Sequence, residues 1–266
     1  MLRFFHQFQP QPIFFQFGWL TIRWYGLLMA LSFIIGIFIL TALGRKKGIK
    51  SDDVYDLAFW LVIGGIIGAR LYEVFFINWD YYKNNLSAIF KIWQGGLAIH
   101  GAIIAGLIVL WFWAKKKKFS FWLLTDLLAV PLALGQAIGR WGNYFNQELF
   151  GPPTNLPWGI PIGEANRPAL FMNEKYFQPA FLYESILDLV LFLIIIRAIK
   201  RGARQGVATV IYFLGYGLIR FFMEFVRIDE TPNVLGLRLP QLASLLIILA
   251  AIFIWAFLLR PNNKKS

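Results

Sequence analysis

The sequence predicts an all-α polytopic membrane protein, both from its composition and from its repeated long apolar runs. Hydrophobic residues make up 58% of the 266 residues and charged residues only 15%, whereas soluble domains average about 25% charged residues. Apolar runs near the roughly 20 residues that a spanning helix needs recur along the chain. This composition excludes soluble, disordered and collagen-like proteins. We expect residues 1–266 to form a single integral membrane domain.

Seven transmembrane helices are expected from these runs. They lie close to residues 19–43, 54–77, 96–114, 120–139, 180–199, 207–226 and 241–259. The second and fourth are less apolar, since the second carries Asp56, Arg70 and Glu73 and the fourth carries Asp126 and Pro131. Pro131 need not end its helix, because neighbouring helices can satisfy the carbonyl that a proline frees. The first run is too long for a cleavable signal peptide.

Four basic clusters set the expected orientation. Each directly follows or joins an apolar run; they are Arg45, Lys46, Lys47 and Lys50; Lys115 to Lys118; Arg197, Lys200, Arg201 and Arg204; and Arg260, Lys264 and Lys265. Cytoplasmic loops carry such an excess of Lys and Arg, so we expect the N-terminus outside and the C-terminus in the cytoplasm. An irregular external segment is then expected over residues 140–179, between the fourth and fifth helices. Because the net charge of +12 is concentrated in these loops, nucleic-acid binding is not expected.

Polar and ionisable side chains gather at the outer ends of six expected helices. In chain order they are Arg23 and Tyr25, Arg70 and Glu73, His100, Arg140 and Asn143, Glu184, and Arg220, Glu224 and Arg227. Ionisable residues inside a membrane mark a candidate functional site. A transporter would carry polar groups along a complete path, whereas the inner half here holds little besides Asp56 and Asp126. The pattern predicts a one-sided chamber open to the outer leaflet, whose arginines indicate an anionic ligand such as a phospholipid phosphate.

Several of these groups also have a purely structural interpretation. Arg70 and Glu73 stand three residues apart and can form an ion pair within one helix. Arg220, Glu224 and Arg227 fall on one helix face, where the glutamate can neutralise either arginine. Both sets therefore remain candidates for interhelical locks as well as for ligand contacts.

His100 is the candidate proton acceptor, although a lone helical histidine is more often a packing residue. It is one of two histidines, with His6, and it lies between Gly95–Gly96 and Gly101, which permit close approach of backbone or substrate. Imidazole changes its charge near neutral pH, as a general base must. The chain has no cysteine, and a metal site is not expected without further His or Cys ligands.

The most specific stretch is Gly139–Gly151, at the outer edge of the fourth expected span. It reads G-R-x-G-N-x-x-N-x-E-x-x-G. Glycine and asparagine can end a helix, but this does not account for an arginine, two asparagines and a glutamate at this depth. The stretch closely resembles the signature of the bacterial prolipoprotein diacylglyceryl transferases. Further similar segments are Arg23–Gly26, Gly68–Arg70, His100–Gly101 and Arg220–Arg227.

One segment departs from the family pattern. Before the fifth span the family usually has His-Pro-x-Gln-Leu-Tyr-Glu, whereas this chain has Gln-Pro-Ala-Phe-Leu-Tyr-Glu over residues 178–184. Gln178 and Phe181 thus stand where the family has His and Gln, which argues against an essential role for this segment.

The resemblance implies the first step of bacterial lipoprotein maturation. Such transferases move the diacylglyceryl group of phosphatidylglycerol onto the thiol of a lipobox cysteine in a prolipoprotein signal peptide, forming a thioether and releasing glycerol phosphate. We therefore expect a multi-pass protein of the bacterial plasma (inner) membrane, with the active site toward the outer leaflet. No cofactor and no metal is expected.

The chemistry assigns roles to the candidate residues. We expect His100 to take the thiol proton and Arg140 and Arg220 to stabilise the leaving phosphate. The other candidates would contact the lipid or the peptide, or orient the arginines; they are Tyr25, Arg70, Asn143, Asn146, Glu148, Gly151, Glu224 and Arg227. Glu148 is a weaker candidate for the base, and Tyr25 can also belong to an aromatic belt.

Two other classes stay open from the residues alone. A transporter or binding protein for an anionic lipid or solute would move or hold its ligand without chemistry. A membrane scaffold would use the charges only as interhelical contacts, and it would tolerate an exchange of Arg220 with Glu224.

Overall fold

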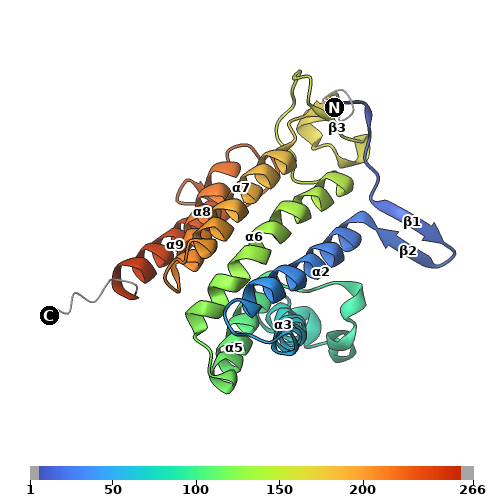
Figure 1. Ribbon diagram of the computed structural model, residues 1–266. Coiled ribbons are helices and arrows are strands. Elements are labelled where there is room, and N and C mark those ends of the chain that lie inside the picture. Colours follow the sequence, from blue (N-terminus) through green and yellow to red (C-terminus); the bar gives the residue numbers. More distant parts are fainter. Residues whose placement is uncertain (1–5, 259–266) are drawn as a thin grey trace. The chain divides into compact units, whose positions relative to one another are not determined.

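The protein is mainly helical (Figure 1), and the computed structural model describes residues 6–258. The chain divides into two compact units: a larger unit of Met1–Ile39 with Asp126–Ser266, and a smaller unit of Leu40–Thr125. Helices α2 (Trp24–Arg45) and α6 (Phe121–Asn146) each contribute residues to both units. The basic cluster expected at Arg260, Lys264 and Lys265, and the expected end of the last span at residue 259, lie outside the described residues.

Several helices have the character of membrane spans. Among the described residues, five helices are long and apolar enough to cross a membrane: Trp24–Arg45, Ser51–Ile77, Ile99–Lys117, Phe121–Asn146 and Leu239–Ala256. A shorter apolar helix covers Val207–Met223. Helix α7 (Ala180–Lys200) has 21 residues but carries Glu184 and Asp188 among its apolar side chains. The predicted class, a helical multi-pass membrane protein, is confirmed.

Two predicted helix boundaries are wrong near the candidate site. The first helix begins at Trp24 rather than at residue 19, because β1 (Ile13–Phe17) and β2 (Leu20–Arg23) form an antiparallel hairpin. These strands are rich in the aromatic and β-branched residues that favour strands. The fourth helix continues through Pro131 to Asn146 instead of ending at residue 139. The first half of the polar motif is therefore helical, and the irregular segment begins only after it.

Smaller differences occur at two later helices. Helix α8 (Val207–Met223) ends three residues before the predicted end at residue 226. Helix α9 (Leu239–Phe253) begins two residues before the predicted start, because Pro240 stands in its first turn and Gln241 accepts a hydrogen bond from the backbone N–H of Arg238. A hairpin of β5 (Asn233–Val234) and β6 (Leu237–Arg238) precedes α9 directly.

The smaller unit is built on two closely packed helices. Helix α3 (Ser51–Tyr72), extended by a π-helical turn η1 (Glu73–Ile77), packs against α5 (Ile99–Lys117). A Cβ atom on Gly68 would lie 2.5 Å from the carbonyl oxygen of Gly101, so these glycines let the two backbones touch. Short helices connect α3 to α5; they are α4 (Trp79–Tyr82), η2 (Leu86–Phe90) and η3 (Ile92–Gln94). Gly101, beside His100, thus serves helix packing.

In the larger unit, α7, α8 and α9 lie side by side (Figure 1). Helix α9 continues as a π-helical turn η6 (Ile254–Leu258). The carboxylate of Asp126 on α6 accepts hydrogen bonds from the backbone N–H groups of Gly206 (2.6 Å) and Thr209 (2.7 Å) at the start of α8. It also accepts the Thr209 hydroxyl at 2.7 Å. Because the first N–H groups of a helix have no partner within the helix, Asp126 caps α8 from another helix.

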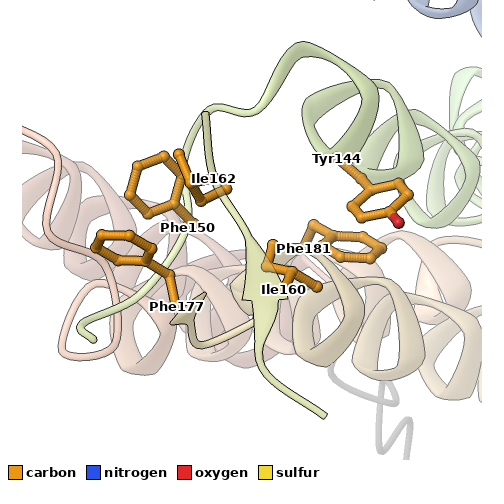
Figure 2. Close-up of a cluster of buried hydrophobic side chains, with 6 residues drawn as sticks. All are labelled: Tyr144, Phe150, Ile160, Ile162, Phe177 and Phe181. Carbon is orange, nitrogen blue, oxygen red and sulfur yellow. The ribbon is translucent and has the colours of Figure 1, made fainter. Parts of the chain in front are cut away.

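The segment between α6 and α7 is irregular, as predicted. It contains a two-residue pairing of β3 (Ile160–Pro161) with β4 (Tyr176–Phe177) and the 3-10 turns η4 (Glu164–Asn166) and η5 (Ala169–Phe171). A buried apolar cluster holds it against the ends of α6 and α7 (Figure 2), formed by Tyr144, Phe150, Ile160, Ile162, Phe177 and Phe181. Burying a large apolar side chain contributes roughly 1.5–3 kcal/mol, so this cluster fixes the segment beside the polar motif.

Candidate functional site

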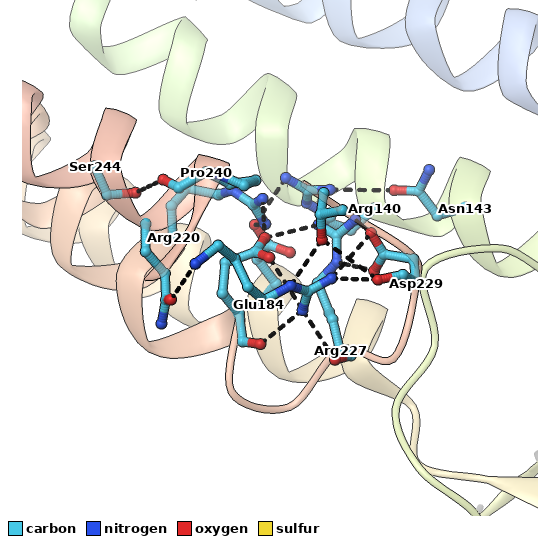
Figure 3. Close-up of polar contacts among 12 residues, drawn as sticks. Arg140, Asn143, Glu184, Arg220, Arg227, Asp229, Pro240 and Ser244 are labelled. Atoms are coloured by element: carbon cyan, nitrogen blue, oxygen red, sulfur yellow. Dashed lines mark hydrogen bonds and ion pairs between the residues drawn. The ribbon is translucent and has the colours of Figure 1, made fainter. Parts of the chain in front are cut away.

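The centre of the candidate site is a carboxylate shared by two arginines of neighbouring helices (Figure 3). Oε1 of Glu184 on α7 lies 2.7 Å from Nη2 of Arg140 on α6 and 3.2 Å from Nη1 of Arg220 on α8. The Glu184 side chain is only 3% exposed, against 17% for Arg140 and 13% for Arg220. A charge in such surroundings is costly unless it is paired, so the three groups depend on one another.

The network continues from Arg220 toward the β5–β6 hairpin. Glu224 pairs with Arg220 through a short contact and lies 3.7 Å from Arg227. Arg227 in turn pairs with Asp229 at 2.8 Å. Arg238 of β6 closes the network, because it lies 3.1 Å from Glu224 and 3.4 Å from Asp229. Ion pairs thus join four guanidinium groups to three carboxylates, and such a cluster can receive an anion through charge-assisted hydrogen bonds.

A chain of amides leads from Arg140 in the other direction. Nη1 of Arg140 donates to the amide oxygen of Asn143 (3.4 Å), and the Asn143 amide nitrogen donates to Oε1 of Glu148 (2.8 Å). Asn146 donates to the same oxygen at 3.2 Å. The motif Gly139–Gly151 therefore brings its Arg, both Asn and its Glu together around the end of α6.

Tyr25 and Gly151 of the predicted site have close packing partners. A Cβ atom on Gly142 would lie 2.4 Å from Cδ2 of Tyr25, so the Tyr25 ring of α2 lies directly on α6 at this point. A Cβ on Gly151 would lie 2.9 Å from the carbonyl oxygen of Val226, which lets the irregular segment touch the chain just before Arg227. Tyr25 and Gly151 therefore shape the surroundings of the network.

Arg70 lies in the smaller unit and is occupied by backbone carbonyls. Its guanidinium group donates to Ile89 (2.8 Å), Gly95 (2.7 Å), Gly96 (2.7 Å) and Ala88. No ion pair joins Arg70 to Glu73 in the described structure, and Glu73 instead accepts the Asn78 amide at 2.6 Å. The interpretation of Arg70 and Glu73 as an ion pair is therefore wrong, and Arg70 holds the loop between α4 and α5.

His100 also belongs to the smaller unit, where it is the second residue of α5. Its side chain is exposed, and its ring lies 5.8 Å from the ring of Tyr72. Of the predicted site residues, the larger unit brings together Arg140, Asn143, Asn146, Glu148, Arg220, Glu224 and Arg227. In the smaller unit, His100 stands at the start of α5, while Arg70 of α3 makes its hydrogen bonds to the loop between α4 and α5.

Known proteins match this chain over nearly its whole length. A family model described as prolipoprotein diacylglyceryl transferase matches residues 12–257. The chain belongs to the prolipoprotein diacylglyceryl transferase family. The phosphatidylglycerol–prolipoprotein diacylglyceryl transferase of Synechocystis sp. is 45% identical over 97% of this chain and 94% of its own length. The enzymes of that name from Acaryochloris marina and Synechococcus elongatus are 43% and 44% identical over 97% and 95% of this chain and 96% and 90% of their own lengths. The resemblance inferred from the motifs is confirmed.

The two departures from the transferase pattern have a physical explanation. Phe181 is 3% exposed and stacks on Tyr144 with ring centroids 4.6 Å apart, inside the apolar cluster of Figure 2. Gln178 pairs through its backbone with Gly151 (2.9 Å) and Pro152 (3.0 Å). Phe181 packs in the apolar cluster, and Gln178 makes its contacts through the backbone. Neither contact requires the side chain that the family usually has at that position.

Sequence reasoning missed three polar residues of this region. Asp229 and Arg238 lie in the connection after α8, outside every expected span, and only the folded hairpin brings them to Glu224. Asp188 lies one helical turn after Glu184 and is completely buried, and its two carboxylate oxygens have no hydrogen-bond partner among the described residues. An acidic residue four positions from Glu184 in an apolar helix was a signal that could have found Asp188.

Proposed function

We propose that this chain transfers the diacylglyceryl group of phosphatidylglycerol to the thiol of a lipobox cysteine in prolipoproteins, forming a thioether and releasing glycerol phosphate. The observation that carries this proposal is the meeting of Arg140 and Arg220 at one buried carboxylate oxygen. The transferase family and the substrates named in its relatives support the same reaction. The chain is accordingly a transferase of lipoprotein biosynthesis.

The proposed membrane arrangement has seven spans, with α7 and α8 added to the five apolar helices. The N-terminus lies outside and the C-terminus in the cytoplasm of the bacterial inner membrane. This orientation is supported by the basic residues at the ends of α2, α5 and α7, such as Arg45, Lys117 and Lys200. It directs the Arg140–Glu184–Arg220 cluster toward the outer leaflet, and we treat residues 1–266 as a single catalytic domain.

The arginines act on the leaving group. The sulfur attacks the saturated glycerol carbon of the lipid, the carbon–oxygen bond breaks, and the phosphate oxygen keeps the electron pair. Arg140 and Arg220 stabilise this growing negative charge by hydrogen bonds, and Arg227 supports them. Removing one such donor from a water-poor site typically costs about 3 kcal/mol of transition-state stabilisation. Glu224 orients Arg220, to which it is paired.

The thiol needs a base, because its ordinary pKa of about 8.5 leaves it mostly protonated at neutral pH. We assign this role to His100, whose exposed imidazole can exchange a proton with a substrate. Asn143 holds Arg140 by a hydrogen bond, and Asn146 and Glu148 extend this chain toward the lipid headgroup. Lateral access from the bilayer serves both the lipid and the signal peptide.

The remaining candidate residues are proposed to shape the site. Tyr25 and Gly151 set the packing of α2 and of the irregular segment beside the network. Arg70 fixes the loop that precedes α5 and hence the start of the helix carrying His100. None of these three needs to contact the reacting atoms to affect the rate.

The decisive assay incubates the purified protein with phosphatidylglycerol and a lipobox peptide and follows the mass of the peptide. The expected result is a gain of one diacylglyceryl group with the Cys peptide and none with a matched Ser peptide. Replacing His100, Arg140 or Arg220 by Ala should abolish thioether formation while the protein still inserts. Near-normal lipidation by His100→Ala would contradict the assignment of the base.

A charge exchange separates an enzyme from a scaffold. The double variant Arg220→Glu with Glu224→Arg retains the pair and should remain folded, but it should lose lipidation because the guanidinium has moved by one helical turn. Retained activity would indicate that these charges only join helices. Flux of glycerol phosphate across sealed vesicles, without lipidation, would instead support transport.

A further inference from the structure

The backbone of His100 is firmly placed, but its imidazole is not held by hydrogen bonds. His100 is the second residue of α5, and this end of α5 is joined to α3, because the N–H of Ala98 donates to the carbonyl of Ala69 at 3.1 Å. Within residues 6–258, no hydrogen bond reaches the imidazole nitrogens. A catalytic base is usually oriented by a further group, so a different kind of contact has to orient this ring.

The ring of Tyr72, the last residue of α3, lies against the imidazole of His100. The two ring centroids are 5.8 Å apart, and the ring planes are inclined by 30°. Gly101 makes this approach possible, since a Cβ atom on Gly101 would lie 2.5 Å from Cβ of Tyr72. Close packing restricts the rotamers that a side chain can adopt. Tyr72 therefore limits the directions in which the imidazole can point.

Tyr72 is itself held by the π-helical turn η1. Phe76 of this turn stacks on Tyr72, with ring centroids 4.9 Å apart and planes inclined by 24°. Asn78 fixes the turn, because its backbone N–H donates to the carbonyl of Glu73 (2.9 Å) and its amide donates to the Glu73 carboxylate (2.6 Å). Such π-helical turns are rare and occur frequently at functional sites. The rings of Phe76, Tyr72 and His100 thus lie in series within the smaller unit.

A contact through rings leaves both imidazole nitrogens available for protons. His100 is exposed, whereas Tyr72 is half-buried. A neutral imidazole accepts a hydrogen bond at one nitrogen and donates at the other, and a carbonyl partner would occupy the donating nitrogen. With Tyr72 as its neighbour, the imidazole can take a proton at one nitrogen and release a proton to water at the other.

We propose that Tyr72 is the positioning residue of the base, and that its ring holds the imidazole of His100 in the direction from which it meets the substrate thiol. The S–H bond of the thiol breaks, the imidazole nitrogen gains the proton, and the sulfur keeps the electron pair with which it attacks the lipid. Tyr72 acts through His100 and does not contact the reacting atoms. This inference rests on the proposed function and on the assignment of His100 as the base.

The first test separates the ring of Tyr72 from its hydroxyl by measuring kcat and KM for a lipobox peptide with phosphatidylglycerol. A general base contributes about 10²–10⁴-fold, so Tyr72→Ala should lower kcat at least about tenfold. The KM for the peptide should change little, and Tyr72→Phe should restore kcat because it keeps the ring. The matched control is Phe75→Ala in the same π-helical turn, since Phe75 stacks on Trp79 at 5.5 Å. This control should leave kcat unchanged.

The second test uses a peptide that does not need a base, with selenocysteine in place of the lipobox cysteine. A selenol is more acidic than a thiol and is ionised at neutral pH. Relative to the parent protein with the same peptide, both His100→Ala and Tyr72→Ala should regain at least about tenfold in kcat, because the contribution of the base is no longer required. Arg220→Ala should remain inactive with both peptides, since Arg220 acts on the leaving phosphate.

Each outcome bears on a different statement. An unchanged kcat in Tyr72→Ala, or an equal loss with both peptides, overturns the role of Tyr72. A loss in Tyr72→Phe as large as in Tyr72→Ala also overturns it, because the hydroxyl would then be the active part. If Tyr72→Ala does not fold, Phe76→Ala takes its place and should show the same pattern more weakly. A His100→Ala variant that selenocysteine does not restore contradicts the assignment of the base, and a parent protein that lipidates neither peptide contradicts the proposed function itself.

Discussion

Arg140 and Glu184 meet at 2.7 Å although they belong to different helices, and the same Glu184 oxygen also receives Arg220 at 3.2 Å (Figure 3). One buried oxygen atom therefore neutralises guanidinium groups from both neighbouring helices. A phosphate that enters this cluster has to share or replace the contacts of Glu184. Glu184 is therefore important for the fold, because it joins α6, α7 and α8 through these ion pairs.

Replacing Glu184 by Gln should destabilise the protein. The change leaves two largely buried guanidinium groups without their shared counter-charge, and breaking a buried pair in this way typically costs about 3 kcal/mol. The midpoint of thermal unfolding in detergent should fall clearly. Glu230→Gln is the control, since Glu230 is exposed. If both variants unfold at the same temperature, the ion pairs of Glu184 do not stabilise the fold.

Replacing Asp188 by Asn should have the opposite effect and stabilise the protein. Asp188 is 0% exposed and its carboxylate has no hydrogen-bond partner among the described residues, so its burial opposes folding. Removing the carboxylate should raise the stability by about 1 kcal/mol. Asp229→Asn is the matched comparison, because it removes two ion pairs of Asp229 and should lower the unfolding midpoint. A lower midpoint for Asp188→Asn would show that this carboxylate has a stabilising partner.

Replacing Gly142 by Ala should disturb the contact between α2 and α6. The added Cβ would lie 2.4 Å from the Tyr25 ring, and forcing extra volume into a packed site typically costs 1–3 kcal/mol, so we expect a loss of about 2 kcal/mol. Gly135→Ala on the same helix is the control, because its Cβ would meet only Ser32 at an ordinary 3.9 Å. Alanine favours helices by up to about 1 kcal/mol over glycine, so this control should keep or raise the stability. Equal effects of the two variants would contradict the close approach of Tyr25.

Replacing Arg70 by Ala should loosen the loop between α4 and α5. Four carbonyl groups lose their common donor, and unpaired buried polar groups are costly. Hydrogen exchange of the backbone amides in residues 86–98 should become faster. A loss of about 1.4 kcal/mol in the free energy of opening corresponds to a tenfold faster exchange, and we expect at least this change. Lys83→Ala is the control, since its ion pair with Asp80 is exposed and contributes little. Unchanged exchange in Arg70→Ala would indicate that the loop is held by other contacts.

The helical membrane class and the family followed from patterns that are local in the sequence. Long apolar runs and the spacing of the motif Gly139–Gly151 need no knowledge of tertiary contacts. The exact helix ends do need them. Helix α6 continues to Asn146 while Trp141 donates to Ser185 of α7 at 3.2 Å and Tyr144 stacks on Phe181, and neither partner can be read from hydropathy.

The candidate site was predictable where its residues lie in or next to expected spans or in the motif Gly139–Gly151. Arg140, Arg220 and Glu224 stood out because charges in apolar helices are rare. Arg238 did not, because a hairpin brings it to its partners Glu224 and Asp229. The hydrophobic pattern of the sequence does not predict this hairpin. Arg70 was found, but its hydrogen bonds go to backbone carbonyls, which residue types do not reveal.

The capping of α8 by Asp126 has a consequence for how the chain is assembled during synthesis. Helix α8 is short, with 17 residues, and two of its N-terminal amide groups depend on a carboxylate supplied by α6. The ribosome completes α6 long before α8 emerges, so the acceptor is already in the membrane when its donors arrive. A nascent chain truncated before residue 206 thus holds Asp126 without the amide groups that it caps, and the start of α8 is capped only once α8 itself has been made.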